Sequence, residues 1–385
     1  MLRFLDAGES HGKGMVTIIE GIPYGLKIRA EDIEEELSRR RLGYGRGARM
    51  KLERDEVEIL SGIRLGKTLG SPLAMMVRNA EYGKWSETMG IDGGEGREKL
   101  TRPRPGHADI AGALKYGTKD IRDILERASA RETVGRVCAG AVAKVMLREM
   151  DMQVWSHVIR IGGVSYETGG RTPNMKEVEK ADEDELRCLR GSVSRRMIDE
   201  INSAGKSGDS LGGTFEVLAY GLPAGLGSHV HWDKRLDSRL AASVMAIQAI
   251  KGVEIGDGFN LAGMRGSGAV DIIRHEDGRG FFRLSNHAGG IEGGITNGET
   301  LVLRAAMKPI PTMARAVESV DIESKERVEA ATERADVCAV PAAAVIAESV
   351  VALVIADALM EKLGGDRMEE INLAFKKMKA EQAKF

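Results

Sequence analysis

The sequence predicts an α+β fold in one large domain spanning residues 1–385. Strand-like and helix-like segments follow one another without the regular strand–helix rhythm of a doubly wound sheet. The chain also shows no internal repeat and no low-complexity linker that would mark a boundary. Its length exceeds that of most single domains, so two domains remain the alternative.

Helical spacing and strand-like alternation place the elements along the chain. The segment EDIEEELSRRR carries its acids first and its bases last, which suits the helix macrodipole. Residues 130–150 combine helical spacing with many small side chains that permit close packing, so we expect this helix at the centre of the fold. Helices are expected over residues 31–41, 108–116, 130–150 and 236–251 and from 308 to the C-terminus, and short strands within 1–30, 55–80, 151–220 and 253–307.

Composition and charge argue against several classes of partner. The net charge is −2 and aromatic residues make up only 4 %, so neither bulk attraction nor base stacking favours nucleic acid, and the charge favours no membrane surface. The longest apolar run, Val337–Met360, contains Glu348 and Asp357, which are costly in a bilayer. We therefore interpret this run as a buried helix rather than a membrane span.

The cysteines indicate a reducing compartment. Cys138, Cys188 and Cys338 are widely spaced and form no CxxC pair, which argues against a disulfide framework and against a structural zinc site. The N-terminus shows no charged-then-apolar signal segment, and metal-ligand spacing is missing. We expect a cytoplasmic protein without a metal.

The motif GESHG at residues 8–12 surrounds His11 with a carboxylate, a hydroxyl and two glycines. A histidine changes charge near neutral pH, so His11 is a candidate for exchanging a proton with a substrate or leaving group. A surface turn with a chance histidine explains the motif equally well.

A basic, glycine-spaced segment follows the first predicted helix. Guanidinium groups bind phosphate and carboxylate bidentately, and glycines at 43, 45 and 47 allow a loop to fold around a ligand. Bases at a helix C-terminus are also expected from the macrodipole alone. The glycines favour an anion site, formed by Arg39, Arg40, Arg41, Arg46, Arg49 and Lys51.

Two further motifs precede predicted helices. In RPRPGHAD, at residues 102–109, prolines stiffen the approach to His107, and Asp109 either caps the next helix or orients that histidine. In RASARET, at residues 127–133, the N-terminal amides of a helix suit an anion. Ser129 and Glu132 also have the spacing of an ordinary capping box, and both interpretations can hold together.

The remaining motifs lie in the second half of the chain. The paired glycines of NHAGGIEGGITNG, at residues 286–298, suggest backbone close to a planar or phosphorylated ligand, with a glycine-rich hairpin as the alternative. Lys308 beside prolines is a fixed cation, and Asp336 either caps the last apolar helix or acts as a partly buried acid or base. Together the motifs predict a cleft for a doubly anionic, phosphorylated small molecule.

Taken in this order, the motifs resemble those of the chorismate synthase family. Each is weak alone, but seven in order over about 330 residues are specific. The matching segments are GESHG, the RRR…GR loop, RPGHAD, RASARET, QAIKGVEIGDGF at Gln248–Phe259, NHAGGIEGGITNG and the pair Arg334 and Asp336.

The resemblance implies a lyase of aromatic amino acid biosynthesis, in the shikimate pathway. Such an enzyme eliminates phosphate from C3 and a hydrogen from C6 of 5-enolpyruvylshikimate 3-phosphate, in an anti-1,4 sense, to give chorismate. It requires reduced FMN without net redox change, because the flavin lends an electron transiently. The resemblance also implies helices sandwiched between antiparallel β-sheets and assembly as a homotetramer.

Family roles are carried over residue by residue. His11 would protonate the departing phosphate, His107 would contact the reduced flavin near N1 and the C2 carbonyl, and Asp336 would help flavin N5 act as a base. FMN contacts would come from Arg127, Ala128, Ser129, Gln248, Ala249, Gly293, Lys308, Pro309, Ile310, Pro311, Thr312 and Arg334. Arg40 and Arg46 match positions assigned to the NADP phosphate, and Arg49 and Arg131 would hold substrate anions.

The chain departs from the family pattern without losing a charged or proton-carrying group. In the basic loop, Leu42 and Gly45 stand where Pro and Ser are more usual. Ala128 stands where Ser is more usual, Ala335 where His or Ser is, and Val337 where Pro is. No segment predicts a nicotinamide domain, so we expect an external flavin reductant. The alternatives are another FMN- or phosphate-binding enzyme, such as a flavin reductase, and a non-enzymatic flavin- or sugar-phosphate-binding protein.

Overall fold

Two antiparallel sheets enclose a layer of helices in the computed structural model, which describes residues 1–47, 55–92, 98–166, 170–278, 280–315, 317–332 and 336–385. The first sheet has the order β1-β2-β6-β3, formed by β1 (Arg3–Ala7), β2 (Gly14–Glu20), β6 (Leu73–Arg78) and β3 (Val57–Ser61). The second has the order β10-β15-β9-β7-β8, formed by β10 (Ile250–Ile255), β15 (Leu301–Met307), β9 (Gly213–Tyr220), β7 (Gln153–Ile161) and β8 (Val164–Ser165).

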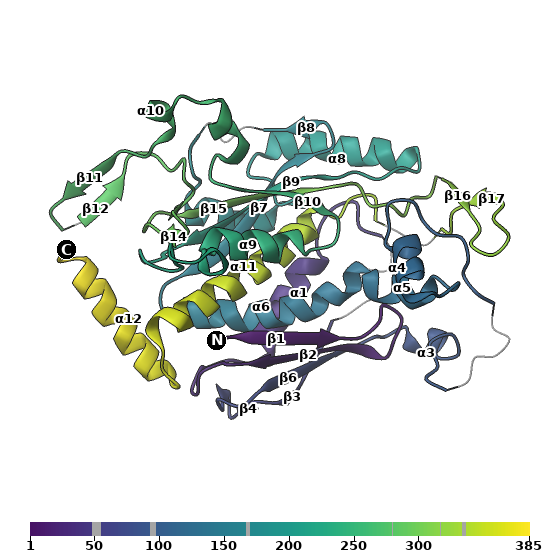
Figure 1. The fold of residues 1–385 in the computed structure, drawn as a ribbon, viewed down its shortest axis with the longest axis horizontal. Helices are drawn as coiled ribbons and strands as arrows, with labels where there is room; N and C mark the ends of the chain where they lie inside the picture. The colour runs from purple at the N-terminus through teal and green to yellow at the C-terminus, as the bar shows by residue number, and fades with distance from the viewer. Residues whose placement is uncertain (48–54, 93–97, 167–169, 279, 316, 333–335) are drawn as a thin grey trace.

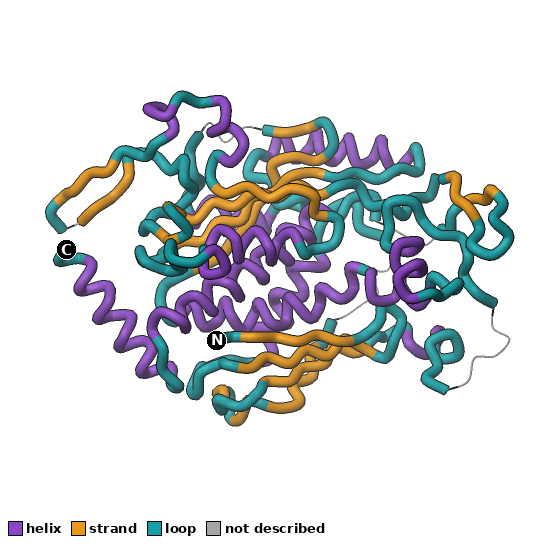
Figure 2. Tube along the Cα trace, in the orientation of Figure 1, coloured by secondary structure: helices purple, strands orange, loops and turns teal. Residues whose placement is uncertain are grey.

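Three helices fill the space between the sheets: α1 (Ala30–Arg41), α6 (Thr133–Arg148) and α11 (Val340–Leu363). Figure 2 shows this helical layer between the two layers of strands. The α+β fold with helices sandwiched between antiparallel sheets is therefore confirmed.

Shorter elements surround the three layers. The other helices are α3 (Tyr82–Trp85), α4 (Asp109–Tyr116), α5 (Arg122–Ala128), α7 (Met175–Glu179), α8 (Gly191–Lys206), α9 (Leu236–Met245), α10 (Gly266–Ala269) and α12 (Met368–Gln382). The two-stranded ladders are β4 (Ile63–Arg64) with β5 (Lys67–Thr68), β11 (Ile273–Glu276) with β12 (Gly280–Arg283), β13 (Ile291–Glu292) with β14 (Ile295–Thr296), and β16 (Glu318–Val320) with β17 (Arg327–Glu329).

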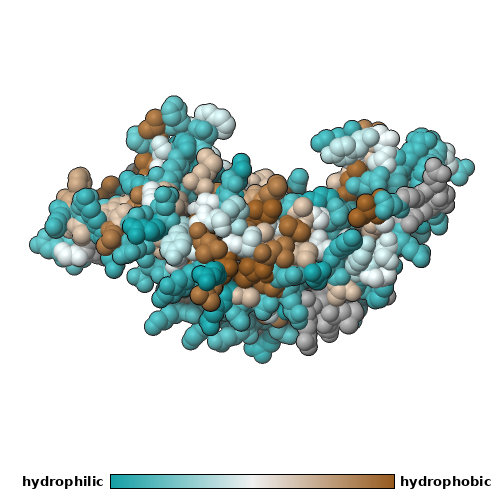
Figure 3. Space-filling model, turned by 90° about the horizontal axis from the view of Figure 1, so that it is seen from below, coloured by the Kyte–Doolittle hydropathy of each residue, from teal (hydrophilic) through white to brown (hydrophobic). Residues whose placement is uncertain are grey.

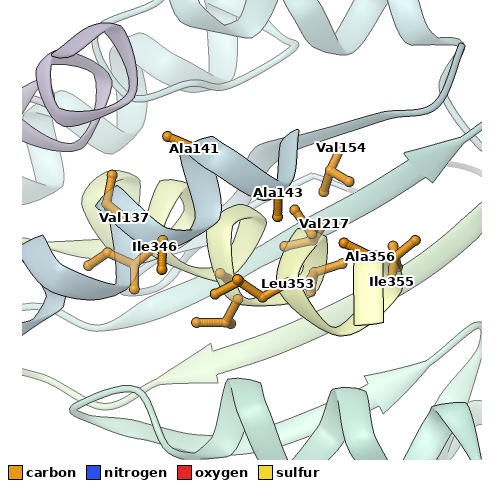
Figure 4. Packing of buried hydrophobic residues seen from close by; sticks show 14 of the residues in the cluster. Val137, Ala141, Ala143, Val154, Val217, Ile346, Leu353, Ile355 and Ala356 are labelled. Atoms are coloured by element: carbon orange, nitrogen blue, oxygen red, sulfur yellow. The ribbon is translucent and has the colours of Figure 1, made fainter. Parts of the chain in front are cut away.

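Small residues let the central helices approach closely, as the sequence predicts. A Cβ on Gly140 of α6 would lie 2.2 Å from the Cβ of Ser349 on α11, so only glycine fits at this crossing. Figure 4 shows Val137 of α6 close to Ile346 of α11, and Val154 and Val217 of the second sheet beside α11. This packing couples the helical layer to the second sheet.

Helix α11 is apolar around its whole circumference and lies inside the protein. It is long and apolar enough to cross a bilayer, but 83 % of its most apolar window is buried by the fold. Pro341 occupies its first turn, where a missing N–H costs nothing. The interpretation of this run as a buried helix is confirmed.

Glu348 places a carboxylate in the middle of this apolar helix, with no exposed surface. Arg39 of α1 donates to it at 2.7 Å, Arg187 at 2.9 Å and Ser156 of β7 at 2.5 Å, and Lys144 of α6 forms a further ion pair. The cluster thus joins three helices and a strand at one point.

The charges of this cluster balance. Glu36 pairs with Arg39 and Lys144, and Asp182 pairs with Arg39 and Arg187, so three carboxylates face three cations. Burial alone would raise the pKa of Glu348, but the three cations outweigh it and hold that pKa far below its usual 4.5. Removing one member would leave an uncompensated charge in the core, which is far costlier than losing an exposed ion pair.

The helix predicted over 236–251 is wrong at its C-terminal end. Helix α9 stops at Met245, and Ile250 begins strand β10, which pairs with β15 from Ile250↔Met307 onward. A turn follows α9, and in it Ala249 has φ 66°, a left-handed conformation that is incompatible with a continued helix. Pairing with a strand fifty residues away therefore overrides the local helical pattern.

The predicted helical C-terminal region is wrong before residue 340. The chain first forms the hairpin of β16 and β17, and helix begins only at Val340. Asp336 does not cap α11, because the N-cap position of that helix is Ala339.

We predict that Glu348→Gln lowers the free energy of unfolding by about 3–5 kcal/mol, because three buried cations lose their shared carboxylate. Since the pKa of Glu348 is lowered on folding, its stabilisation is full above about pH 4.5 and is lost as the pH falls below that value. Urea denaturation at several pH values measures both effects. Glu58→Gln, which removes an exposed pair with Arg78, is the control and should cost less than about 1 kcal/mol. Equal effects of the two substitutions would contradict the role given to Glu348.

Candidate functional site

A cavity of about 420 Å³ opens where segments far apart in sequence meet at one end of the layers. Its walls come from the β1–β2 turn, the end of α1, the start of α4, the α5–α6 junction, the α9–β10 turn, the end of β15 and the start of α11. In Figure 1 the β1–β2 turn and α5 lie side by side, and Ser10 donates to the carbonyl of Glu126 there at 2.9 Å. The volume is typical of small-molecule sites.

Most of the site residues predicted from the sequence line this one cavity. These are His11, Arg40, Arg46, His107, Ala128, Ser129, Arg131, Gln248, Ala249, Lys308, Ile310, Pro311, Thr312 and Asp336. The structure therefore brings together residues from position 11 to position 336.

Three predicted residues that the structure describes are not among those that line the cavity. Arg127 instead binds Asp6 at 2.6 Å and the carbonyl of Gly8 at 3.2 Å, and Pro309 is absent from the wall. Gly293 lies in the turn between β13 and β14, outside the wall. Arg49 and Arg334 fall outside the described residues.

His11 is held at the cavity wall and is 7 % exposed. Its ring Nδ1 lies 3.0 and 3.1 Å from the two carboxylate oxygens of Glu126, and its backbone N–H donates to Glu126 at 2.8 Å. The ring also lies against Trp85, with centroids 4.0 Å apart. The motif is thus a buried, oriented corner and not a surface turn.

His107 is oriented by the acid two residues after it. The Nδ1 atom of His107 lies 2.5 Å from Asp109, which also binds Arg104 at 2.8 Å. Burial alone would raise the pKa of Asp109, but its hydrogen bonds to His107 and Arg104 outweigh burial and hold that pKa well below the usual range. Of the two interpretations of Asp109 in the sequence, orientation of the histidine is the one observed.

Arg40 and Arg131 share one buried carboxylate. Asp55 lies 2.7 Å from Arg131 and 3.6 Å from Arg40, and Arg40 also donates to the hydroxyl of Thr133 at 3.1 Å. Both arginines line the cavity, so their common partner presents two guanidinium groups side by side. Such a pair suits a phosphate or a carboxylate.

Asp336 organises the basic loop. Its carboxylate lies 2.9 Å from Nε of Arg46 and accepts the backbone N–H of Gly47 at 2.7 Å. Lys308 is fixed opposite, donating to the carbonyl of Gly106 at 2.6 Å. Five cations among the described residues therefore face the cavity: Arg40, Arg46, Arg104, Arg131 and Lys308.

The other walls of the cavity are apolar or carry backbone. They are formed by Leu125, Ile247, Met307, Ile310, Pro311, Ala339, Ala342, Ala343 and Ile346. An apolar wall in the same cavity as fixed cations suits a ligand that combines a planar ring system with phosphate.

Gln248 and Ala249 fit the flavin contacts that the sequence predicts. The side chain of Gln248 donates to Glu132, while its buried carbonyl oxygen has no protein hydrogen-bond partner. A buried acceptor of this kind at a cavity wall is suited to an N–H of a ligand. Ala249 is held at φ 66°, a strained conformation that brings backbone to the same wall.

The predicted capping box in RASARET is wrong in its second half. Ser129 Oγ accepts the N–H of Arg131 at 3.4 Å, but Glu132 binds Arg136 and Gln248 instead of reaching back. A 3-10 turn over Ala130–Glu132 separates Ser129 from α6, and Ser129 lines the cavity.

The three cysteines are buried and free, and the described residues contain no group of three potential metal ligands.

Arg104, Glu126 and Asp55 also belong to the site, although they were not predicted from the sequence. Arg104 stands in the quoted RPRPGHAD motif, and its place between two prolines is a signal that could have found it. Glu126 and Asp55 gave no such signal, because the contacts of Glu126 with His11 and of Asp55 with Arg131 join residues 115 and 76 positions apart in the chain.

Comparison with known proteins identifies the family. The family model described as chorismate synthase matches residues 2–360. This chain belongs to the chorismate synthase family. The protein named chorismate synthase from Carboxydothermus hydrogenoformans is 54 % identical to it, and the match covers 96 % of each chain. The protein of the same name from Aquifex aeolicus is 51 % identical, and the match covers 97 % of this chain and 96 % of the other. A crystal structure titled chorismate synthase matches with a TM-score of 0.82 and 43 % identity, covering 100 % of this chain and 99 % of the other.

Proposed function

We propose that the cavity is the active site of a chorismate synthase, which eliminates phosphate from 5-enolpyruvylshikimate 3-phosphate with reduced FMN bound in the same cavity. One observation carries this proposal: two oriented histidines and Asp336 meet five cations and an apolar wall in a single cavity. An elimination that combines a flavin with a multiply charged substrate needs all of these groups together.

The substrate anions are assigned to the cationic side of the cavity. Arg40, Arg46 and Arg131 hold the phosphate and carboxylate groups, and Arg49 is proposed to join them. Because Asp55 and Asp336 fix the first three in place, little side-chain entropy is lost when the substrate binds. Arg40 and Arg46 also match the positions linked to an NADP phosphate.

His11 is the proposed general acid. The leaving phosphate gains negative charge as its bond to C3 breaks, and a proton delivered from a histidine at the wall stabilises that charge. The buried position of His11 excludes water from this transfer.

Reduced FMN, when bound, supplies the transient electron that eases departure of the phosphate. Ala128, Ser129, Gln248, Ala249 and the segment from Lys308 to Thr312 would hold it, while His107 and Asp336 are assigned to its polar edge. Arg127, Gly293, Pro309 and Arg334 stay proposed contacts that lie outside the observed wall or outside the described residues. We also propose a cytoplasmic location and an external flavin reductant.

We propose a homotetramer, supported by an apolar sheet face. On the outer side of the first sheet Leu5 is 71 % and Ile18 41 % exposed, and the two are paired across β1 and β2. Figure 3 shows apolar residues gathered in the middle of the face seen from below, the side on which Figure 1 draws this sheet. A face of this kind indicates contact with a second copy.

Ile18→Glu is predicted to dissociate the tetramer, because it places a charge in that contact. Sedimentation velocity would then report smaller species. The control is Leu373→Glu, which replaces an exposed apolar residue on α12 and should leave the tetramer intact. A tetramer that survives Ile18→Glu would refute the assignment of this face.

His11→Ala and His107→Ala are each predicted to lower turnover about 10²-fold or more, the range for lost acid–base assistance. FMN should remain bound in both variants, as measured by flavin fluorescence, since neither replaces a backbone contact. Full activity in both variants would disprove the proposed mechanism.

Phosphate release should occur only when the flavin is reduced beforehand, because the oxidised ring has no electron to lend. Phosphate is assayed anaerobically with dithionite-reduced FMN, and in air with oxidised FMN as the comparison. With NADPH as the sole reductant we expect no turnover. Release in air with oxidised FMN would contradict the role given to the flavin.

A further inference from the structure

Glu126 on α5 binds the β1–β2 turn at several points. It is 2 % exposed, and its carboxylate accepts the backbone N–H of His11 at 2.8 Å and faces ring Nδ1 of His11 at 3.0 and 3.1 Å. Its backbone carbonyl accepts the N–H of Ser10 at 2.9 Å. One residue therefore fixes both the backbone and the ring of the histidine.

This contact determines which ring nitrogen faces the cavity. A carboxylate only accepts hydrogen bonds, so Nδ1 of His11 must carry the hydrogen that points to Glu126. Burial alone would raise the pKa of Glu126, but the hydrogen bonds and charge of His11 outweigh it and lower that pKa, with a further contribution from Arg122. The carboxylate stays ionised at neutral pH, and Nε2 is the ring nitrogen on the side away from Glu126.

A second contact holds the face of the imidazole. Trp85 of α3 lies against the ring with centroids 4.0 Å apart and planes at 33°. Arg122 links the two supports, since it binds Glu126 at 3.0 Å and its guanidinium lies 5.2 Å from the centroid of the Trp85 ring. The ring is thus fixed both at its edge and on one face.

We propose that Glu126 is a positioning residue that locks His11 in the orientation with Nδ1–H toward α5 and Nε2 toward the substrate phosphate. This inference rests on the proposed function, in which His11 is the acid. Glu126 acts through His11 and does not itself line the cavity.

The state of His11 in the native protein tests the proposal directly. The chain has seven histidines, and comparison with His11→Asn assigns the signals of His11 in ¹⁵N-histidine-labelled protein without ligands. In the neutral form of the ring we expect a single tautomer with the hydrogen on Nδ1. A hydrogen on Nε2 instead would overturn the proposal, and this measurement needs no substitution at Glu126.

Glu126→Gln extends the test to catalysis. The amide offers one acceptor oxygen for the two N–H groups of His11, so we expect a mixture of tautomers. We also expect kcat to fall about 10- to 100-fold, the range for a lost hydrogen bond to a charged group, while KM changes little. Glu9→Gln, which removes an exposed carboxylate two residues from His11, is the matched control and should leave both readouts unchanged.

The outcomes separate the two proposals. If Glu126→Gln changes neither kcat nor the tautomer of His11, the positioning role is overturned. A lower kcat with an unaltered tautomer would also overturn it, because that result indicates a structural effect alone. Full turnover of His11→Ala would instead remove the proposed acid, whatever tautomer Glu126 imposes.

Discussion

The ion cluster around Glu348 is the constraint on which the rest of the molecule depends. A fully buried carboxylate in an apolar helix is tolerable only when its neutralising cations arrive from other elements, here α1, α6 and the segment around Arg187. Pairing Glu348 with these cations sets how the three central helices pack between the sheets. The close approach of Gly140 to Ser349 and this cluster together select one alignment of α6 and α11.

That alignment also places the site. Arg39 and Arg40 are neighbours at the end of α1, yet Arg39 binds Glu348 in the core while Arg40 lines the cavity. The alignment of α6 brings Thr133 to Arg40, and the start of α11 brings Asp336 to Arg46. The cavity is therefore formed by loops whose positions are fixed by the core behind them, which keeps its cations in place before a ligand arrives.

The sandwich was predicted only through the resemblance that motifs in a family's order carry, and the same motifs hold most of the predicted residues that line the cavity. Small side chains at helical spacing predicted the central place of α6. The sequence did not predict the end of α9 at Met245, since that end is set by pairing of β10 with β15. It also gave no sign of Glu126 or Asp55, whose roles arise from contacts across more than seventy residues. Gly293 shows the converse, since its motif is distinctive but the residue lies outside the cavity wall.

We propose that one cavity holds flavin and substrate together, with Nε2 of His11 facing the phosphate that leaves. A crystal structure of this protein with oxidised FMN and 5-enolpyruvylshikimate 3-phosphate is the decisive experiment. We expect the flavin ring against Gln248 and Ala249 and the substrate phosphate within hydrogen-bond distance of His11 Nε2. A phosphate bound elsewhere in the cavity, with His11 contacting neither ligand, would contradict it.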